Sequence, residues 1–255
     1  MKRTLAIILT VFLIATTAVL LVACDGGIKT EEDWNNAMDA FLTADAVTLK
    51  IKDDAWTYQY NIGILDRHDK TNVTLAFDAE MGVVAITHKY NDYSLRGGWT
   101  NGTYHLYYVK DGTNVIFYRK YEDSSFGWSR FTRQFDTEEQ AAAFLREQYT
   151  NPYSAIDAFY RDEEKFFPTF DELEYSKFEA DTWGKFEYVK TDSDGRVNTY
   201  TLNFTNGKPS KFTFDTRIPK EVVDTDKYSV TISYSAKITL PDGLPTEDID
   251  TNNSH

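Results

Sequence analysis

Few residues of this 255-residue chain have the types and spacing that catalysis or metal binding requires. The histidines, His68, His88, His105 and His255, are scattered, and no two have the i, i+3 or i+4 spacing of a helical zinc site. The sequence contains no Gly-x-Ser-x-Gly nucleophile motif, P-loop or glycine-rich dinucleotide turn. We therefore expect no metal, no cofactor and no catalytic residue.

Acidic residues offer two weaker candidates for chemistry. Asp192–Gly195 is similar to part of a calcium-binding loop, but Lys190 stands at the first ligand position, so a hairpin turn is the simpler interpretation. The acids of Asp162-Glu163-Glu164 and Asp171-Glu172 could supply the acid and base of a glycoside hydrolase. Because both groups lie in strongly charged stretches, we expect a solvated surface there and predict that the protein is not an enzyme.

The single cysteine, Cys24, follows a segment with the pattern of a secretion signal. Lys2 and Arg3 precede an apolar run from Leu5 to Leu20, and the run ends in Leu21-Val22-Ala23-Cys24. One cysteine excludes an internal disulfide and a cysteine-based zinc site. An uncleaved membrane-spanning helix is the alternative, because the apolar run is nearly long enough to cross a bilayer.

The tetrapeptide Leu21-Val22-Ala23-Cys24 resembles the lipobox of bacterial lipoproteins. In that family the signal is cleaved immediately before the cysteine, whose thiol receives a diacylglycerol. The resemblance implies that residues 1–23 are a signal peptide ending at Ala23 and that Cys24 is the site of lipid attachment. The mature chain would then be extracytoplasmic and anchored to the cell membrane, since two acyl chains suffice for stable anchoring. Residues 24–29 would form a flexible tether.

Composition restricts the partners and supports a folded domain. Forty acidic against 27 basic residues give a net charge of −13, which argues against a nucleic-acid partner. The same charge predicts repulsion from anionic membranes, so we expect the lipid alone to hold the protein there. A hydrophobic content of 42%, including 15% aromatic residues, is ample for one sizeable core.

Hydrophobic periodicity predicts one α+β domain over residues 30–241, followed by a polar tail at 242–255. One helix is predicted to begin at Thr30, and a helical insertion is predicted from Thr137 to Tyr160. Alternating segments predict about ten antiparallel strands, among them 56–64, 73–79, 185–190, 197–204, 210–214 and 228–240. Turns between strands are expected at Gly97-Gly98, Asn101-Gly102 and Asp111-Gly112.

Two further runs, Tyr104–Val109 and Val115–Tyr118, are apolar at both parities. A strand with two apolar faces must be covered on both sides, by helices on one and by a second layer, a cavity or a partner on the other. Aromatic residues could simply fill the core, but we predict that some line a ligand cleft. The candidate ligand-binding residues are Trp56, Trp99, Tyr104, Leu106, Tyr108, Phe117 and Trp128.

The order of helix, strand meander, helical insertion and closing strands resembles the LolA/LolB-like half-barrel over about residues 30–241. The resemblance implies a strongly curved antiparallel sheet, with the N-terminal helix and the helical insertion packed on it and an apolar cavity between. No residue here can be matched to the acyl-binding arginine of the lipoprotein carriers, so lipoprotein transport is not implied.

Three functions follow from these patterns. The first is a non-catalytic, membrane-anchored module that binds a lipid or another apolar small molecule. The second is an envelope protein-interaction or regulatory module whose protein partner is unknown, and the third is a hydrolase. A cavity lined by rings would favour the first, an exposed apolar edge the second, and two facing acids the third.

Overall fold

The computed structural model describes residues 27–59, 64–122, 125, 127–150, 173–181, 184–193, 195–218 and 222–248. Its side chains are described except at 57–59, 64–67, 218 and 222–225. The predicted signal with Ala23 and Cys24, the second half of the helical insertion, and the acids at 162–164 and 171–172 lie outside the described residues. Within the described ranges, no helix is long and apolar enough to cross a membrane.

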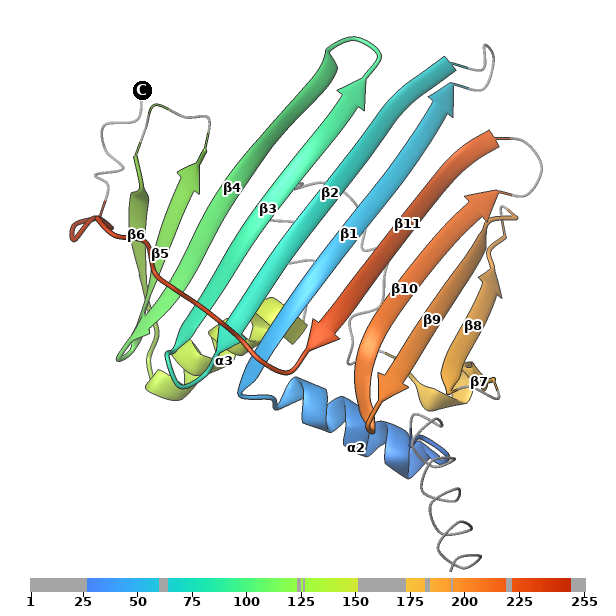
Figure 1. The fold of residues 1–255 in the computed structure, drawn as a ribbon, viewed down its shortest axis with the longest axis horizontal. Coiled ribbons are helices and arrows are strands. Elements are labelled where there is room, and N and C mark those ends of the chain that lie inside the picture. Colours follow the sequence, from blue (N-terminus) through green and yellow to red (C-terminus); the bar gives the residue numbers. More distant parts are fainter. Residues whose placement is uncertain are drawn as a thin grey trace, which may run out of the picture.

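In the described part of the chain, eleven strands form one antiparallel sheet in the order β6-β5-β4-β3-β2-β1-β11-β10-β9-β8-β7 (Figure 1). The strands are β1 Ala46–Gln59, β2 Ile64–Asp78, β3 Val83–Ser94, β4 Gly98–Asp111, β5 Asn114–Tyr121, β6 Ser129–Gln134, β7 Glu179–Ala180, β8 Lys185–Thr191, β9 Val197–Thr205, β10 Lys208–Ile218 and β11 Val222–Ser233. The first strand pairs with the last at the centre of the sheet. The strands β6 and β7 are its two edges, so the sheet is open. The predicted α+β class with one antiparallel sheet is confirmed, with eleven strands instead of about ten.

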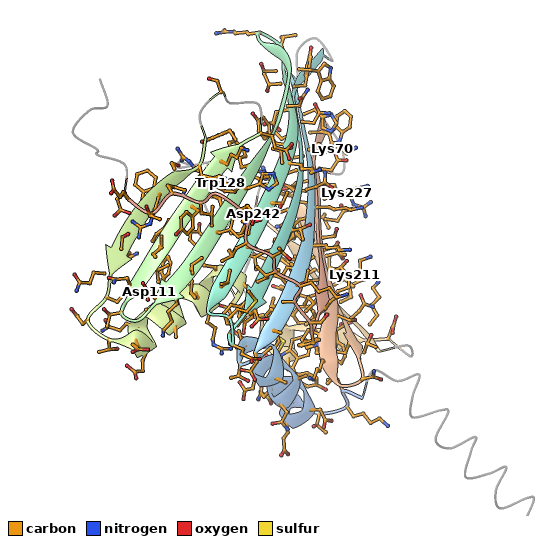
Figure 2. All side chains as sticks on the ribbon, turned by 60° about the vertical axis from the view of Figure 1, so that its left-hand side comes forward. Lys70, Asp111, Trp128, Lys211, Lys227 and Asp242 are labelled. Carbon is orange, nitrogen blue, oxygen red and sulfur yellow. The ribbon has the colours of Figure 1, made fainter. Side chains whose placement is uncertain are left out.

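The sheet is twisted and curved, as strands of this length require. Figure 2 shows β4–β6 turned relative to β1, β10 and β11. The two α-helices in the described part of the chain, α2 (Glu31–Leu42) and α3 (Glu138–Thr150), lie near one end of the strands. They pack on one side of the sheet, α2 against β10 and α3 against β2–β5.

Both helices begin where the sequence predicts. The Thr30 hydroxyl accepts a hydrogen bond from the Asp33 backbone N–H at 3.1 Å, and the Asp33 carboxylate accepts one from the Thr30 N–H at 3.0 Å. This reciprocal capping box satisfies N–H groups that the first turn leaves unpaired. At α3 the Gln140 N–H donates to the Thr137 hydroxyl at 3.2 Å, which makes Thr137 the corresponding cap.

Tyr149 of α3 joins the two helices and the sheet. Its hydroxyl donates to the Leu42 carbonyl at the end of α2, at 2.8 Å, and its ring centroid lies 4.8 Å from that of Phe77 on β2. Arg146, one turn earlier, donates to the Ala44 carbonyl at 2.9 Å. These contacts satisfy carbonyl groups at the C-terminal end of α2, where the helix supplies no partner of its own.

The strands have two distinct faces, which we call the inner face and the outer face. In β1, Val47, Leu49 and Ile51 are buried on the inner face against the helices, whereas Lys50 and Lys52 are exposed on the outer face. Antiparallel pairing extends this alternation across the sheet. The core is therefore a set of cross-strand rows of inner-face residues, closed by the helices.

The strand predicted at 228–240 is wrong beyond Ser233, where β11 ends. Residues 234–248, which we call the C-terminal segment, leave the sheet and cross its outer face towards β6 (Figure 1). The segment is held at both ends, because Thr48 donates to the Ser235 carbonyl at 2.7 Å and Thr132 donates to the Asp248 carboxylate at 2.9 Å. The alternation that suggested a strand persists: Ala236, Ile238 and Leu240 are half-buried and the residues at 235, 237 and 239 are exposed.

Two other sequence predictions are also wrong. The run 56–64 is not one strand, since β1 ends at Gln59 and its antiparallel partner β2 begins at Ile64. Asn101-Gly102 is not a turn, because both residues lie within β4, with Gly102 opposite Tyr90 of β3. A Cβ atom on Gly102 would lie 2.6 Å from the Tyr90 hydroxyl oxygen and 2.7 Å from a carbon of its ring. The glycine therefore makes room for a tyrosine side chain that lies across it.

We predict that Gly102→Val destabilises the protein by about 1–3 kcal/mol, although valine is the better strand former. The reason is displacement of the Tyr90 ring, which stacks on Tyr104 with the ring centroids 5.3 Å apart. Chemical denaturation measures the effect. Gly127→Val is the matched control, because a Cβ atom there meets nothing within 4 Å. A Gly102→Val variant as stable as the native chain would contradict this account.

Candidate functional site

The seven predicted ligand-binding residues lie on both faces of the sheet and do not form one cleft. Tyr104, Leu106 and Tyr108 of β4 share the inner face with Phe117 of β5. The outer face carries the tryptophans at 56, 99 and 128.

The inner group is packed against other rings of the protein. Tyr108 and Phe117 have ring centroids 5.0 Å apart, and both contact Phe144 of α3, at 6.1 and 5.7 Å. Tyr104 stacks on Tyr90. Leu106 is buried. The inner side of the doubly apolar strands is therefore filled here by side chains from β3 and α3.

The outer group divides between two places. Trp56 stacks on His68 with the ring centroids 3.5 Å apart, and the His68 ring lies 5.7 Å from that of Trp99, which is 55% exposed. Trp128 lies further along the sheet, with its ring 5.6 Å from that of Tyr107.

The C-terminal segment supplies the second layer that the doubly apolar strands require. Ile116 and Tyr118 lie on the outer face of β5, opposite Thr132 and Arg130 of β6. Both β6 side chains bind the carboxylate of Asp248 in the C-terminal segment. Strands that are apolar on both faces are thus covered by a helix on one side and by an extended segment on the other.

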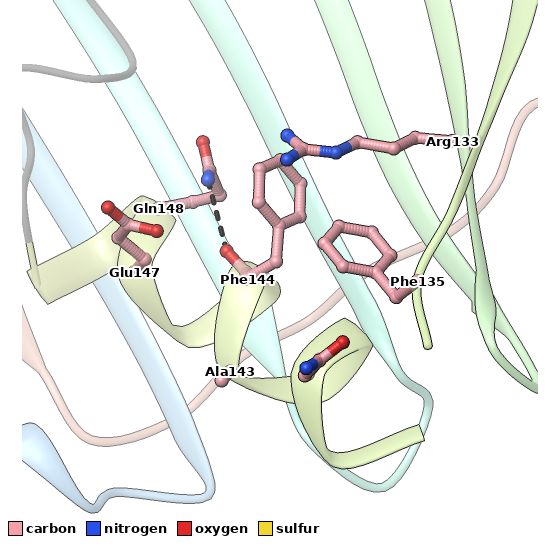
Figure 3. A pocket seen from close by; sticks show the side chains of 7 residues that line it. Arg133, Phe135, Ala143, Phe144, Glu147 and Gln148 are labelled. Atoms are coloured by element: carbon pink, nitrogen blue, oxygen red, sulfur yellow. Dashed lines mark hydrogen bonds between the residues drawn. The ribbon is translucent and has the colours of Figure 1, made fainter. Parts of the chain in front are cut away.

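An open pocket of about 630 Å³ lies beyond Phe144, between α3 and β6 (Figure 3). Its wall is formed by Arg133, Phe135, Gln140, Ala143, Phe144, Glu147 and Gln148. Phe144 therefore has two roles, because its ring covers Phe117 in the core and also forms part of the pocket wall. None of the seven predicted residues lines this pocket.

Arg133 gives the pocket its chemical character. Its guanidinium carbon lies 4.8 Å from the Phe135 ring centroid and 5.2 Å from that of Phe144, within the range of cation–π attraction. Among the described residues it forms no ion pair, and it is exposed to solvent. Gln148, only 5% exposed, donates to the Phe144 carbonyl at 3.0 Å and holds that turn of α3 in place. The pocket thus combines two apolar rings with one accessible positive charge.

A smaller pocket of about 280 Å³ lies at the other side of the sheet, near Phe178, Tyr188 and Tyr200. Its two cations are already paired, Lys177 with Glu174 at 2.8 Å and Lys190 with Asp192 at 2.9 Å. Those ion pairs leave less positive charge for a ligand than Arg133 offers. We therefore take the α3–β6 pocket as the candidate ligand site.

A pair of half-buried carboxyl groups, Asp53 of β1 and Asp226 of β11, lies on the inner face, with one oxygen atom of each buried. Burial, and next the neighbouring Asp226 carboxylate, raise the pKa of Asp53 to about 9, so the pair retains a proton at neutral pH. Tyr228, opposite Asp53, is buried beside the pair, and its pKa is raised by burial and by both carboxyl groups. Perturbed pKa values of this kind occur at functional sites and also in structural clusters.

The other candidates for chemistry have ordinary partners. The Asp192 carboxylate accepts hydrogen bonds from the Lys190 ammonium at 2.9 Å and the Asn198 amide at 2.7 Å, and β8 pairs with β9 around this turn. The hairpin interpretation is therefore confirmed. His105 is hydrogen-bonded to Glu122 at 2.8 Å, and burial lowers the pKa of His88 to about 4. Within the described residues, no three of His, Cys, Asp and Glu are grouped to hold a metal.

No protein-family model matches the chain, and no curated protein matches it. Among solved structures, an S-type phycobiliprotein lyase from Guillardia theta is similar at 8% sequence identity. The match covers 84% of this chain and 100% of that chain, with a TM-score of 0.22.

This comparison contradicts the prediction that the chain is not an enzyme, because the similar structure is that of a lyase. At a TM-score of 0.22 the likeness assigns no reaction, substrate or catalytic residue to this chain.

We predict that Asp53→Asn stabilises the protein by about 1–3 kcal/mol at pH 8, because the amide cannot ionise beside Asp226. The native state holds the Asp53 proton more tightly than the unfolded chain, whose carboxyl has the ordinary pKa of 3.8. Native stability therefore falls as the pH rises from about 4 towards about 9, and the gain from Asp53→Asn grows over the same range.

Thermal unfolding at pH 4 and pH 8 measures this difference. Asp111→Asn is the control, because Asp111 is exposed at the end of β4 (Figure 2). An Asp53→Asn variant that is less stable than the native chain at pH 8 would show that the ionised carboxylate has a stabilising partner.

Proposed function

We propose that the protein is a lipid-anchored, extracytoplasmic binding protein for an amphipathic ligand with an apolar or aromatic body and an acidic group. The α3–β6 pocket is the proposed binding site. The observation that carries the proposal is the Arg133 guanidinium, which lies over the rings of Phe135 and Phe144 at the wall of an open pocket. The rings would contact the body of the ligand, and the guanidinium would bind its carboxylate, phosphate or sulfonate.

The dimensions and composition of the pocket support this role. Its volume of about 630 Å³ lies within the range of small-molecule sites, which are mostly apolar with a few polar groups. Glu147 lines the same pocket and would disfavour a ligand with acidic groups at both ends. The ligand class is thus narrower than the lipid or other apolar molecule that the sequence suggests.

The anchor in this proposal rests on the lipobox-like tetrapeptide ending in Cys24. Cleavage before Cys24 would leave 24–29 as a tether of a few residues before α2 begins at Glu31. We also propose the LolA/LolB-like half-barrel as the relationship of the domain. That relationship requires an open curved sheet over helices, and the open sheet with α2 and α3 on one side supports it.

We predict that Cys24→Ala abolishes lipid attachment. The native protein should yield an N-terminal peptide that begins at Cys24 and carries two acyl chains on its thioether-linked glyceride, measured by mass spectrometry. The variant should lose that modification, because its residue 24 has no thiol. An unmodified Cys24 in the membrane fraction of native cells would contradict the anchor and favour an uncleaved helix.

We predict that Arg133→Gln weakens binding of anilinonaphthalene sulfonate, an aromatic anion, about tenfold through loss of one charge-assisted contact. Phe135→Ala should weaken binding of that probe and of the uncharged probe N-phenylnaphthylamine. Arg119→Gln is the matched control, because its guanidinium lies over the Tyr121 ring, 5.0 Å from the ring centroid, and outside the pocket. Fluorescence titration measures all three variants. Equal affinities for Arg133→Gln and Arg119→Gln would refute the site.

A further inference from the structure

The outer face opposite the helices has a charge opposite to that of the whole chain. Between β10 and β3 it carries basic side chains on five neighbouring strands and carboxylates at Asp54, Asp215 and, at the end of β2, Asp78. We call this part of the outer face the basic face. Its basic residues, all exposed, are Lys50, Lys52, Lys70, Lys89, Lys211, Arg217 and Lys227.

The register of the strands concentrates this charge. Thr231 of β11 lies between Lys211 of β10 and Lys50 of β1 in one cross-strand row. Neighbouring strands are about 4.8 Å apart, so the two lysines start about 10 Å from each other, and Lys52 is two residues further along β1. Asp54 is engaged by Lys70 at 3.8 Å, whereas Lys50, Lys52 and Lys211 have no ion-pair partner among the described residues. Figure 2 shows Lys70, Lys211 and Lys227 projecting from one side of the sheet.

The C-terminal segment covers a different part of the outer face. After β11 the segment passes Thr48 of β1, which donates a hydrogen bond to the Ser235 carbonyl. It then crosses towards β6, where Asp248 binds Arg130 and Thr132. The outer-face residues of β2 and β3 at that end include the buried Ala76 and Val83. The apolar part of the outer face is thus covered by the chain itself, and the basic face is left open to solvent.

The N-terminus of the described chain lies at the rim of the same half of the sheet. A Cβ atom on Gly27 would lie 3.6 Å from the backbone of Gly207, in the turn between β9 and β10. Cys24 precedes Gly27 by three residues, which span at most about 11 Å. A lipid on Cys24 would therefore hold this rim close to the membrane surface.

Aromatic side chains lie at the opposite end of the basic face. Trp99 is 55% exposed, its ring lies 5.2 Å from that of Tyr93, and Leu95 in the following turn is 42% exposed. Trp and Tyr are the residues that favour the headgroup level of a bilayer, where one side of the ring is apolar and the other is hydrated. The basic face thus has a lipid anchor near one end, exposed rings at the other end and lysines between them. This arrangement would let the whole face contact an anionic bilayer surface.

We propose that the basic face lies against a bilayer that contains anionic phospholipids, so that the protein is docked by this face as well as tethered by its lipid. This inference rests on the anchor of the proposed function. Each lysine near an anionic surface contributes attraction that decays within a Debye length of about 8 Å at physiological salt. Acidic residues that lie more than a Debye length from the membrane surface are screened from it. The positive charge of the basic face therefore determines the interaction, although the net charge of the chain is −13. The repulsion expected from composition is thereby reversed for this one orientation.

The test uses the full chain with Thr231→Cys, labelled with an environment-sensitive fluorophore and reconstituted in vesicles. Cys24 is the only native cysteine, so the new thiol is the only one available once Cys24 is acylated. Acrylamide quenching should fall about threefold or more in vesicles with 30% phosphatidylglycerol, compared with phosphatidylcholine alone. The charge reversals Lys50→Glu, Lys52→Glu and Lys211→Glu, combined, should abolish the difference.

Asn36→Cys is the matched control, because Asn36 is exposed on α2 near the tether but not on the basic face. Equal quenching at position 231 in both vesicle types, or an equal response at position 36, would overturn the proposal. A response to soluble polyphosphate without one to the vesicles would also overturn it and identify a soluble polyanion as the partner. The same measurement on Cys24→Ala separates the two ideas. Protection that persists without acylation supports the docking face independently of the anchor, whereas an unmodified Cys24 in the native protein would reject only the anchor.

Discussion

The pairing of β1 with β11 is the constraint on which the rest of the structure depends. It joins the meander β1–β6 to the strands β7–β11, so that one sheet is formed instead of two. Because pairing fixes the register as well as the neighbours, it places Asp53 opposite Tyr228 on the inner face and Lys50 opposite Thr231 on the outer face. The half-buried acid pair and part of the basic face thus lie on the two sides of one strand pair.

The apolar residues of the two faces are covered by different parts of the chain. On the inner face, the helices cover the apolar rows, and Trp34 of α2 packs against Phe186 and Phe204 with ring centroids 5.2 Å away in each case. On the outer face, the C-terminal segment covers the apolar side of β2–β5 without forming a strand. A segment that alternates in burial can cover a sheet by side-chain contact alone, with a few hydrogen bonds such as that from Thr48 to Ser235.

The candidate pocket arises where this covering ends. Phe144 is needed to cover Phe117, and its other side is left facing Phe135 and Arg133 at the edge of the sheet. An arginine over two rings at an edge keeps its charge in water while its planar group rests on apolar surface. The pocket therefore needs no separate cavity in the core, which the rings of Tyr104, Tyr108 and their neighbours already occupy.

Local signals in the sequence determined the helix starts at Thr30 and Thr137, the antiparallel class, the hairpin around Asp192 and the need to cover the doubly apolar strands on both sides. Each depends on neighbours along the chain, through a cap, a two-residue period or a turn. Tertiary structure alone decided that Gly102 lies under Tyr90, that residues beyond Ser233 leave the sheet, and that Arg133 meets Phe144. Periodicity states which side chains share a face of their own strand. It does not state which strand lies beside which in the sheet. The pairing of strands brings together residues from distant segments of the chain.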